Sequence, residues 1–372
     1  MLSLHDDYPL HQTIDPIAHP STTDLNYYDR YFFNGFSRDA DLFFAVAMGL
    51  YPNRRVLDAS LSVVRDGRQI SLHASRLAPA ERSETRVGPL SIEVIDPMRV
   101  LRVRSTANDS GLECDLLFRA RTSAIEEPRM TLAHEGRLLM NTTRFTQFGS
   151  WEGSLRVDGT RLDVSAERVL GVRDRSWGIR PVGERSAGAP GPPPQFFWLW
   201  APLHFDDRCT LLGVTENAEG RVTHSGGAVA PVYASPEQVP ATDASGIERM
   251  ASVAHRIRWQ PGTRRSSGAE IELVPHGADA LSITLEPLLC FPMLGIGYAH
   301  PEWGHGLWKG EQALAAESWK LDELDPLDPR HIHVQQLCRA RLGDQEGVGV
   351  LEQLVIGPHD PYGFHSLLDG AA

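Results

Sequence analysis

The residues most able to do chemistry stand in one run of six, RDRSWG, which begins at Arg173. If this run is a strand, successive side chains point to opposite faces of a sheet. Arg173, Arg175 and Trp177 then share one face, and Asp174 and Ser176 share the other. Burial among apolar walls would raise the pKa of Asp174, because desolvation disfavours a charged carboxylate. A carboxylic acid that keeps its proton near neutral pH can donate it to a substrate.

Two other interpretations of this run stay open. If Arg173 and Arg175 fold back onto Asp174, the carboxylate stays ionised, and the three side chains form a buried network that ties strands together. Alternatively, the same charges anchor a polar group of a substrate. The run therefore indicates where a site lies, whereas the chemistry of its residues alone does not select a reaction.

Tryptophans gather in two windows of the chain. Trp198 and Trp200 would share one face of the aromatic strand 196–201. Indole rings fill cores, and they also line pockets for flat or polyene ligands and stabilise cations through their π faces. On the second interpretation, we expect Trp177, Trp198 and Trp303 to line one pocket. Seven of the eight tryptophans belong to these windows: Trp151, Trp177, Trp198 and Trp200, then Trp303, Trp308 and Trp319.

The stretch YAHPEWGHGLWKGE, residues 298–311, mixes histidines, acids and tryptophans with three glycines. Gly304 and Gly306 disfavour a helix, so we expect a loop. The spacing of His300 and His305 does not match the helical HExxH zinc pattern, and we expect no metal ion. The polar side chains are either satisfied within the turn or supply acid, base and substrate contacts. The candidates are His300, Trp303, His305, Trp308 and Glu311.

Short strands with period-two alternation fill most of the chain. In Leu112–Ala120 every second residue is apolar, and Asp66-Gly67 and Asp158-Gly159 are two-residue hairpin signals. No long segment keeps a 3.6-residue apolar period, and the best helix candidate, Gly310–Trp319, also fits a strand. About sixteen short strands with frequent turns favour an all-β chain of antiparallel barrels or sandwiches.

The length of 372 residues exceeds one ordinary hydrophobic core and suggests two domains. A Gly/Pro-rich loop at 183–195 is the natural boundary. We therefore predict an N-terminal β domain at residues 1–190 and a C-terminal β domain at residues 191–372.

Composition excludes several classes of function. A formal net charge of −12, without a basic block, argues against a nucleic-acid partner. We see no secretory signal, and the apolar runs are too short to span a membrane. The four cysteines are widely scattered, which is typical of reduced thiols and predicts a cytoplasmic protein. Without a P-loop, a GxGxxG after a strand or a GxSxG elbow, we expect no cofactor.

From Gly171 to Arg180, GVRDRSWGIR, and in the aromatic strand that follows, the chain resembles the carotenoid 1,2-hydratase (hydroxyneurosporene synthase) and AttH-like superfamily. The later HPxWxHGxWxGE pattern is similar to the C-terminal half of its uncharacterised bacterial branch. The resemblance covers roughly residues 25–360. It implies two lipocalin-like β-barrel domains packed together around a hydrophobic pocket, in a superfamily that includes alkene hydratases and cyclising enzymes.

For the hydratases, the resemblance implies that a carboxylic acid protonates an alkene, a tertiary carbocation forms, and water captures it. Asp174 matches the proton donor or its orienting partner, and His204 would help to position water. We therefore expect a cofactor-independent hydratase, cyclase or isomerase whose substrate is a hydrophobic terpenoid- or steroid-like alkene. The alternative is a non-catalytic carrier of lipids or other hydrophobic small molecules.

Overall fold

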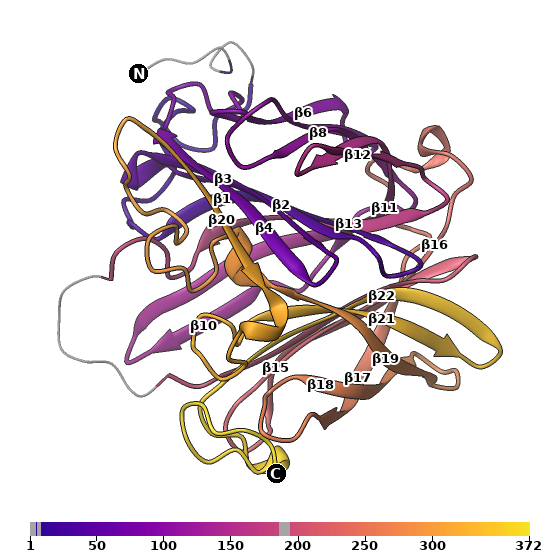
Figure 1. Cartoon of the computed structure of the whole chain (residues 1–372). Helices are drawn as coiled ribbons and strands as arrows, with labels where there is room; N and C mark the ends of the chain where they lie inside the picture. The colour runs from indigo at the N-terminus through magenta and orange to yellow at the C-terminus, as the bar shows by residue number, and fades with distance from the viewer. Residues whose placement is uncertain (1–4, 6–8, 186–193) are drawn as a thin grey trace.

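The computed structural model describes residue 5, residues 9–185 and residues 194–372, and these contain 22 strands and a few short 3-10 helices (Figure 1). The strands form two antiparallel units, an open sheet of 14 strands and a closed barrel of eight. The prediction of an all-β, lipocalin-like chain is confirmed, although the first unit stays a curled half-barrel. Most of the Gly/Pro-rich boundary, residues 186–193, lies outside the described residues.

The first sheet runs in the order β20-β4-β3-β2-β1-β13-β11-β8-β7-β6-β5, with β9, β10 and β12 paired to β11. Its strands are β1 (Tyr27–Ser37), β2 (Phe43–Tyr51), β3 (Val56–Arg65), β4 (Arg68–Leu77), β5 (Arg86–Val87), β6 (Leu90–Asp96), β7 (Val100–Ser105), β8 (Leu112–Ala120), β9 (Ile125–Glu126), β10 (Met130–His134), β11 (Arg137–Val157), β12 (Thr160–Val164), β13 (Val169–Ile179) and β20 (Gln312–Lys320).

The barrel closes through the pairing of its first and last strands, β14 and β22. Its strands are β14 (Phe196–His204), β15 (Arg208–Glu216), β16 (Val222–Pro231), β17 (Glu248–Trp259), β18 (Ser266–Pro275), β19 (Leu281–Pro292), β21 (Val334–Leu342) and β22 (Gln345–Ile356). Among the described residues, no helix is both long and apolar enough to cross a membrane.

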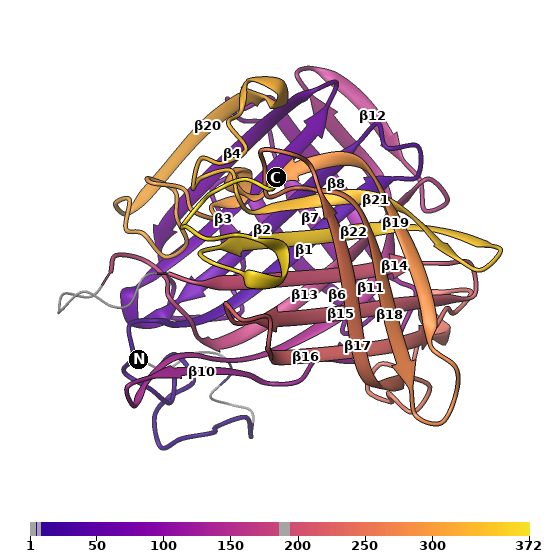
Figure 2. The same ribbon diagram turned by 90° about the horizontal axis from the view of Figure 1, so that it is seen from below.

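The barrel lies against one face of the first sheet (Figures 1 and 2). Alternation along β14 explains how this contact forms. Phe197 and Leu199 point into the barrel, whereas Trp198 and Trp200 point outward and pack with Val172 and other apolar residues of the first sheet. Burying each such side chain stabilises the fold by about 1.5–3 kcal/mol, so this shared core fixes the packing of the two units.

Strand β20 comes from the second half of the chain but belongs to the first sheet. It pairs with β4 along its whole length, from Gln312 opposite Arg76 to Lys320 opposite Arg68. The helix candidate Gly310–Trp319 is therefore wrong, and the strand reading that the pattern also allowed is the observed one. Its Ala, Leu, Glu and Lys residues have good helix propensity, but tertiary pairing overrides such a weak preference.

Strand β11 is a single strand of 21 residues that runs from Arg137 to Val157. It pairs with β13 over its first part and with β8 over its second part. This long strand carries side chains to the contact with the barrel and helps to build the site described next.

Candidate functional site

Asp174 lies on the central strand β13 and faces the barrel. In the neighbouring strands its partners in register are Phe32 of β1 and Thr146 of β11. Val172, on the same face of β13, packs against the barrel. The alternation expected from the RDRSWG run is therefore present, and it places the carboxyl group in the layer between the first sheet and the barrel.

Arg173 and Arg175 do not fold back onto Asp174, because they leave the opposite face of β13. Arg30 of β1 and Arg144 of β11 are instead the cations on its own face, and both lie opposite Ser176 in register. These two guanidinium groups act to lower the pKa of Asp174. The charge arrangement thus depends on cross-strand neighbours rather than on neighbours in the sequence.

The carboxyl group of Asp174 has no hydrogen bond or close ion pair with any residue that the structure describes, and its side chain keeps some accessible surface. Burial raises its pKa from 3.8 to about 6, which outweighs the opposing effect of Arg144 and Arg30. The negative charges of Glu127 and Glu352 add to the increase. Asp174 is therefore an acid whose pKa lies much closer to neutral pH than that of an ordinary carboxyl group.

Glu127, by contrast, is hydrogen-bonded through both of its carboxylate oxygens. Its two carboxylate oxygens accept hydrogen bonds from Arg144 Nη2 and from Thr146 Oγ1, each at 2.6 Å. The same arginine places its guanidinium carbon 4.8 Å from the ring centre of Trp198 and 5.9 Å from that of Trp200. The two indoles that share a face of β14 thus hold a cation beside Asp174.

Glu352, on β22, approaches the same layer from the barrel. It accepts hydrogen bonds from Trp198 Nε1 at 3.1 Å and from Gln335 Nε2 at 2.6 Å, and His333 Nε2 lies 2.9 Å away. Although burial opposes it, the hydrogen bonds from His333 and Gln335 and the charge of Arg144 keep the pKa of Glu352 below its usual value. His333 Nδ1 is buried without a partner among the described residues. The ring is therefore best assigned with its proton on Nε2 and a free lone pair on Nδ1.

His305, from the loop 298–311, joins the layer through arginines. Its Nε2 lies 2.8 Å from the carbonyl oxygen of Ile296, which can only accept, and its Nδ1 lies 3.3 Å from Arg180 Nη2, which can only donate. Burial, together with the charges of Arg30 and Arg180, holds the pKa of His305 well below its usual value. The ring is thus neutral, with both nitrogens in use.

Tyr298 and Arg30 connect His305 to the rest of the layer. Arg30 Nη1 donates to Tyr298 Oη at 2.5 Å, and the tyrosine ring meets both His305 and His333 edge-on at 4.5 Å. We call this layer the interlayer site. It consists of Arg30, Glu127, Arg144, Asp174, Tyr298, His305, His333 and Glu352.

Three residues of the run, Arg173, Arg175 and Trp177, lie on the far side of β13. Arg173 is buried and donates to Gln147 Oε1 at 2.8 Å, and burial with the nearby charge of Arg175 lowers its pKa to about 9. Arg175 pairs with Asp29 at 2.6 Å. Trp177 is 37% exposed. The structure therefore does not bring Trp177 to the same place as Trp198.

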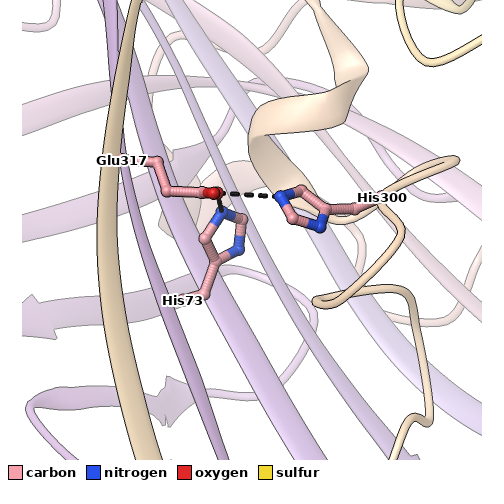
Figure 3. Close-up of side chains that lie close together, drawn as sticks. All are labelled: His73, His300 and Glu317. Atoms are coloured by element: carbon pink, nitrogen blue, oxygen red, sulfur yellow. Dashed lines mark hydrogen bonds and ion pairs between the residues drawn. The ribbon is translucent and has the colours of Figure 1, made fainter.

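His300 and Trp303 belong to a third location, on the side of β4 that faces the barrel. Figure 3 shows His73, His300 and Glu317 converging, with His300 Nε2 at 2.8 Å and His73 Nε2 at 3.2 Å from the same oxygen of Glu317. Trp303 stacks on the ring of His73 at 5.7 Å. Because His73 is on β4 and Glu317 is on β20, this cluster fastens the loop and the added strand to the first sheet.

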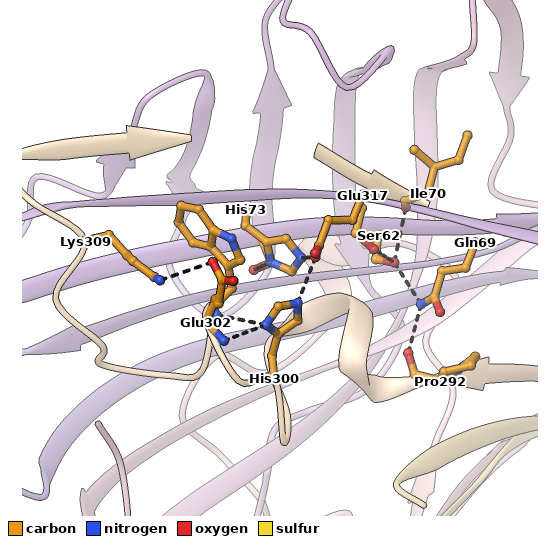
Figure 4. A network of polar contacts seen from close by, with 12 residues as sticks. Ser62, Gln69, Ile70, His73, Pro292, His300, Glu302, Lys309 and Glu317 are labelled. Atoms are coloured by element: carbon orange, nitrogen blue, oxygen red, sulfur yellow. Dashed lines mark hydrogen bonds and ion pairs between the residues drawn. The ribbon is translucent and has the colours of Figure 1, made fainter. Parts of the chain in front are cut away.

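The same three side chains present ligand atoms within 4.8 Å of one another, so they must be tested as a metal site. His300 Nδ1 accepts the backbone N–H groups of Glu302 and Trp303 at 3.1 and 2.9 Å (Figure 4). These two donors place the ring proton on Nε2, which then donates to Glu317. A metal would need the lone pair of that nitrogen. The cluster is therefore suited to a hydrogen-bonded clasp rather than to a cation.

Three predicted site residues lie outside both the interlayer site and the cluster of His73, His300 and Glu317. His204 is fully buried, where Nδ1 accepts from Arg121 at 2.9 Å and Nε2 donates to the carbonyl oxygen of Gly171 at 3.2 Å. Burial and the charge of Arg121 hold the pKa of His204 well below its usual value. Trp308 is 52% exposed, and Glu311 lies on the surface.

Sequence reasoning missed most of the interlayer site. Arg30 stands within the aromatic run NYYDRYFFNG, and Glu352 interrupts the apolar run VGVLEQLVI. A charge inside an otherwise apolar strand costs free energy unless it is paired, so both were visible signals of a buried polar cluster. Arg144 and Glu127 carried no comparable signal.

Comparison with known proteins shows the family of this chain. It belongs to a family of unknown function (DUF8625), whose model matches residues 2–365. A search of curated proteins finds no match.

Solved structures share the fold at low identity. A putative AttH from Nitrosomonas europaea is 13% identical, over 93% of this chain and 98% of that one, with a TM-score of 0.52. Kievitone hydratase from Nectria haematococca is 12% identical, over 88% of each chain, with a TM-score of 0.51. CghA with Sch210972 is 12% identical, over 89% of this chain and 88% of that one, with a TM-score of 0.50. These likenesses establish an AttH-like fold.

Proposed function

We propose that this protein is a cofactor-independent enzyme that protonates the double bond of a hydrophobic terpenoid- or steroid-like alkene, as a hydratase, cyclase or isomerase. Asp174 is the proton donor. The observation that carries the proposal is its unbonded carboxyl group, which has a pKa of about 6 in a layer where the other carboxyl groups are bonded. An acid whose pKa is raised toward neutral pH and that has no bonding partner is available to a substrate.

Two carboxylates near Asp174 favour the positive intermediate of such a reaction. Glu127 and Glu352 raise the pKa of Asp174 because their negative charges oppose its ionisation. The same field stabilises positive charge that develops on a substrate carbon nearby. Arg144 and Arg30 act in the opposite sense, and each has a larger effect on Asp174 than either carboxylate has. Glu127 binds the guanidinium of Arg144, which also lies over Trp198. The two carboxylates thus offset part of the positive charge of the arginines at the place where a carbocation would form.

In a hydratase, a second group must accept a proton from the attacking water. His333 is suited to this role, because Glu352 holds its Nε2 and leaves the Nδ1 lone pair free. His204 and His305 are less suited, since both nitrogens of each ring already have partners. Protonation by Asp174 and loss of a proton to His333 add one water molecule in balance, and a proton returned from His333 to Asp174 closes the cycle.

The solved structures support this reaction class without establishing it. One neighbour is named a hydratase, and its fold covers most of this chain. The position of Asp174 between the two units agrees with a reaction that needs a water-poor setting. The substrate, including any carotenoid, stays part of the proposal.

The test is isotope incorporation into a panel of prenylated phenols, acyclic terpenes and sterol alkenes. In D2O and H2-18O, the wild-type chain should transfer deuterium to at least one alkene, and it should transfer 18O if it is a hydratase. Asp174→Asn should lower deuterium transfer by about 100-fold or more, the usual contribution of a general acid. Asp115→Asn, on the surface of β8, is the matched control and should behave as the wild type.

Two results contradict the proposal. An Asp174→Asn variant that keeps its turnover excludes Asp174 as the acid. Alkenes that bind to the wild-type chain without any isotope transfer favour the carrier.

A further inference from the structure

A cavity of about 740 Å³ lies on the face of the first sheet that is turned away from the barrel. Its floor consists of apolar side chains from three strands, Met48 of β2, Leu57 of β3 and Ile92 of β6 among them, and each of these is buried. Residues 10–21 of the N-terminal segment line the other side. This volume falls within the range of small-molecule sites, which is about 300–1,000 Å³.

The polar wall of the cavity is made by two arginines that share one carboxylate. Arg175 Nη1 lies 2.6 Å from one oxygen of Asp29, and Arg82 Nη2 lies 3.2 Å from the other. The guanidinium carbon of Arg175 is also 4.0 Å from the ring centre of Tyr31. These contacts hold both cations in place before any ligand arrives, which reduces the entropy cost of binding.

The positive charge of this wall is only partly neutralised. Two guanidinium groups against one carboxylate leave one positive charge, and the side chains of Asp29, Arg82 and Arg175 are only 21–25% exposed. Burial acts to lower the pKa of Arg175, but the charge of Asp29 and its hydrogen bond act to raise it, and the pKa lies above its usual value. The arginine therefore stays charged, with further N–H donors beyond its single bond to Asp29.

The other acids that line the cavity have less effect on the recognition of a ligand. Glu84 is bonded to Arg76 at 2.8 Å, and Asp15 and Glu93 are exposed to solvent. Exposed charges are screened by water and salt, whereas partly buried ones act at a lower effective dielectric constant. The two arginines thus dominate recognition at the inner wall.

The side of the cavity formed by the N-terminal segment is tied to the sheet. Asn53 Nδ2 donates to the carbonyl oxygens of Thr22 and Asp24, each at 2.8 Å. Arg82 Nη1 donates to the carbonyl oxygen of Ile17 at 3.5 Å, so one residue contacts both Asp29 and this segment. The N-terminal segment is therefore tied to the first sheet at Ile17, Thr22 and Asp24.

We infer that this cavity is a second binding site and that its ligand is an amphipathic carboxylate of the fatty-acid class. The apolar chain lies on Met48, Leu57 and Ile92, and the carboxylate binds Arg175 and Arg82. The site is distinct from the interlayer site, because Asp174 and Arg175 leave opposite faces of β13. It goes beyond the proposed function, and its ligand need not be a substrate.

The test is calorimetric titration of the purified full chain with laurate and, separately, with dodecanol, which has the same chain length without the charge. We expect one laurate per chain, and dodecanol bound at least about tenfold more weakly, as charge-assisted hydrogen bonds predict. Arg175→Gln should weaken laurate about 10- to 100-fold and leave dodecanol unchanged. Arg258→Gln, which removes an exposed arginine of the barrel, is the matched control.

A second variant keeps the test decisive if Arg175→Gln fails to fold. Leu57→Trp fills the floor and should abolish binding of both probes, while thermal unfolding verifies the fold. Equal affinity for laurate and dodecanol, or laurate binding that Arg175→Gln and Leu57→Trp leave intact, would overturn the inference. Because alkene turnover is measured separately, failure here leaves the role of Asp174 untouched.

Discussion

Replacing Asp174 by Asn should make the protein more stable at neutral pH. The fold raises the pKa of Asp174 from 3.8 to about 6, so the ionised carboxylate is less favourable in the folded chain than in the unfolded one. Each pKa unit corresponds to about 1.4 kcal/mol, and the shift therefore costs up to about 3 kcal/mol of stability at pH 7 and above. Asparagine resembles the protonated acid in shape and avoids this cost.

The raised pKa determines how the stability difference between Asp174→Asn and the wild type changes with pH. A raised pKa in the folded state means that the folded chain holds the proton more tightly between pH 4 and 6. The contribution of Asp174 is therefore fully favourable below pH 4 and is lost as the pH rises through 6. The stability difference between Asp174→Asn and the wild type should be near zero at pH 4 and should grow to its full value by pH 7.

Urea unfolding of both proteins at several pH values measures this difference directly. Asp115→Asn serves as the control, because Arg102 lowers the pKa of Asp115, so removing its charge should bring no gain at neutral pH. A stability gain that accompanies lost turnover would mark Asp174 as a residue kept for chemistry at a cost in stability. A variant that is less stable than the wild type at pH 7 would refute the reasoning and favour a structural carboxylate.

Two further substitutions test the pairs around the site. Glu127→Ala should destabilise the fold by about 3–5 kcal/mol, because it leaves Arg144 without its carboxylate, and thermal unfolding at pH 7 would show whether it does. Glu317→Gln should cost about 1–3 kcal/mol, since His73 and His300 lose a charged acceptor, and it should speed hydrogen exchange of the β20 amides. Glu323→Gln, an exposed change just beyond β20, should leave that exchange unaltered.

The architecture was predictable from the sequence because its signal is local. Alternating apolar residues and Asp-Gly turns mark strands such as β3, β4 and β8, and two-residue turns force neighbouring strands to pair. The assignment of Asp174 and Arg175 to opposite faces needed only the period of a strand. By contrast, β20 resisted prediction, because its strand state is imposed by β4, more than two hundred residues earlier in the chain.

The electrostatics of the site could not be predicted from the run around Asp174. Its arginine neighbours in sequence, Arg173 and Arg175, are the ones that cannot reach it. Arg30, Arg144 and Glu352 surround it because of the registers of β1, β11 and β22, which are long-range properties. The tautomer of His333 likewise depends on contacts between strands. Sequence patterns locate a chemically active residue more readily than the partners that set its pKa.

The added strand β20 has a consequence for how the chain can be divided. A cut at residue 190 would separate the first sheet from one of its own strands, since Gln312–Lys320 would remain with the barrel. The first fragment would then present the bare edge of β4 and a His73 that has lost Glu317, and such an edge invites aggregation. Two such fragments made as separate polypeptides would become obligate partners, joined by a donated strand as well as by the shared core between the two units. The protein thus lends itself to a split reporter, in which recovery of fluorescence or activity signals that the strand has been inserted.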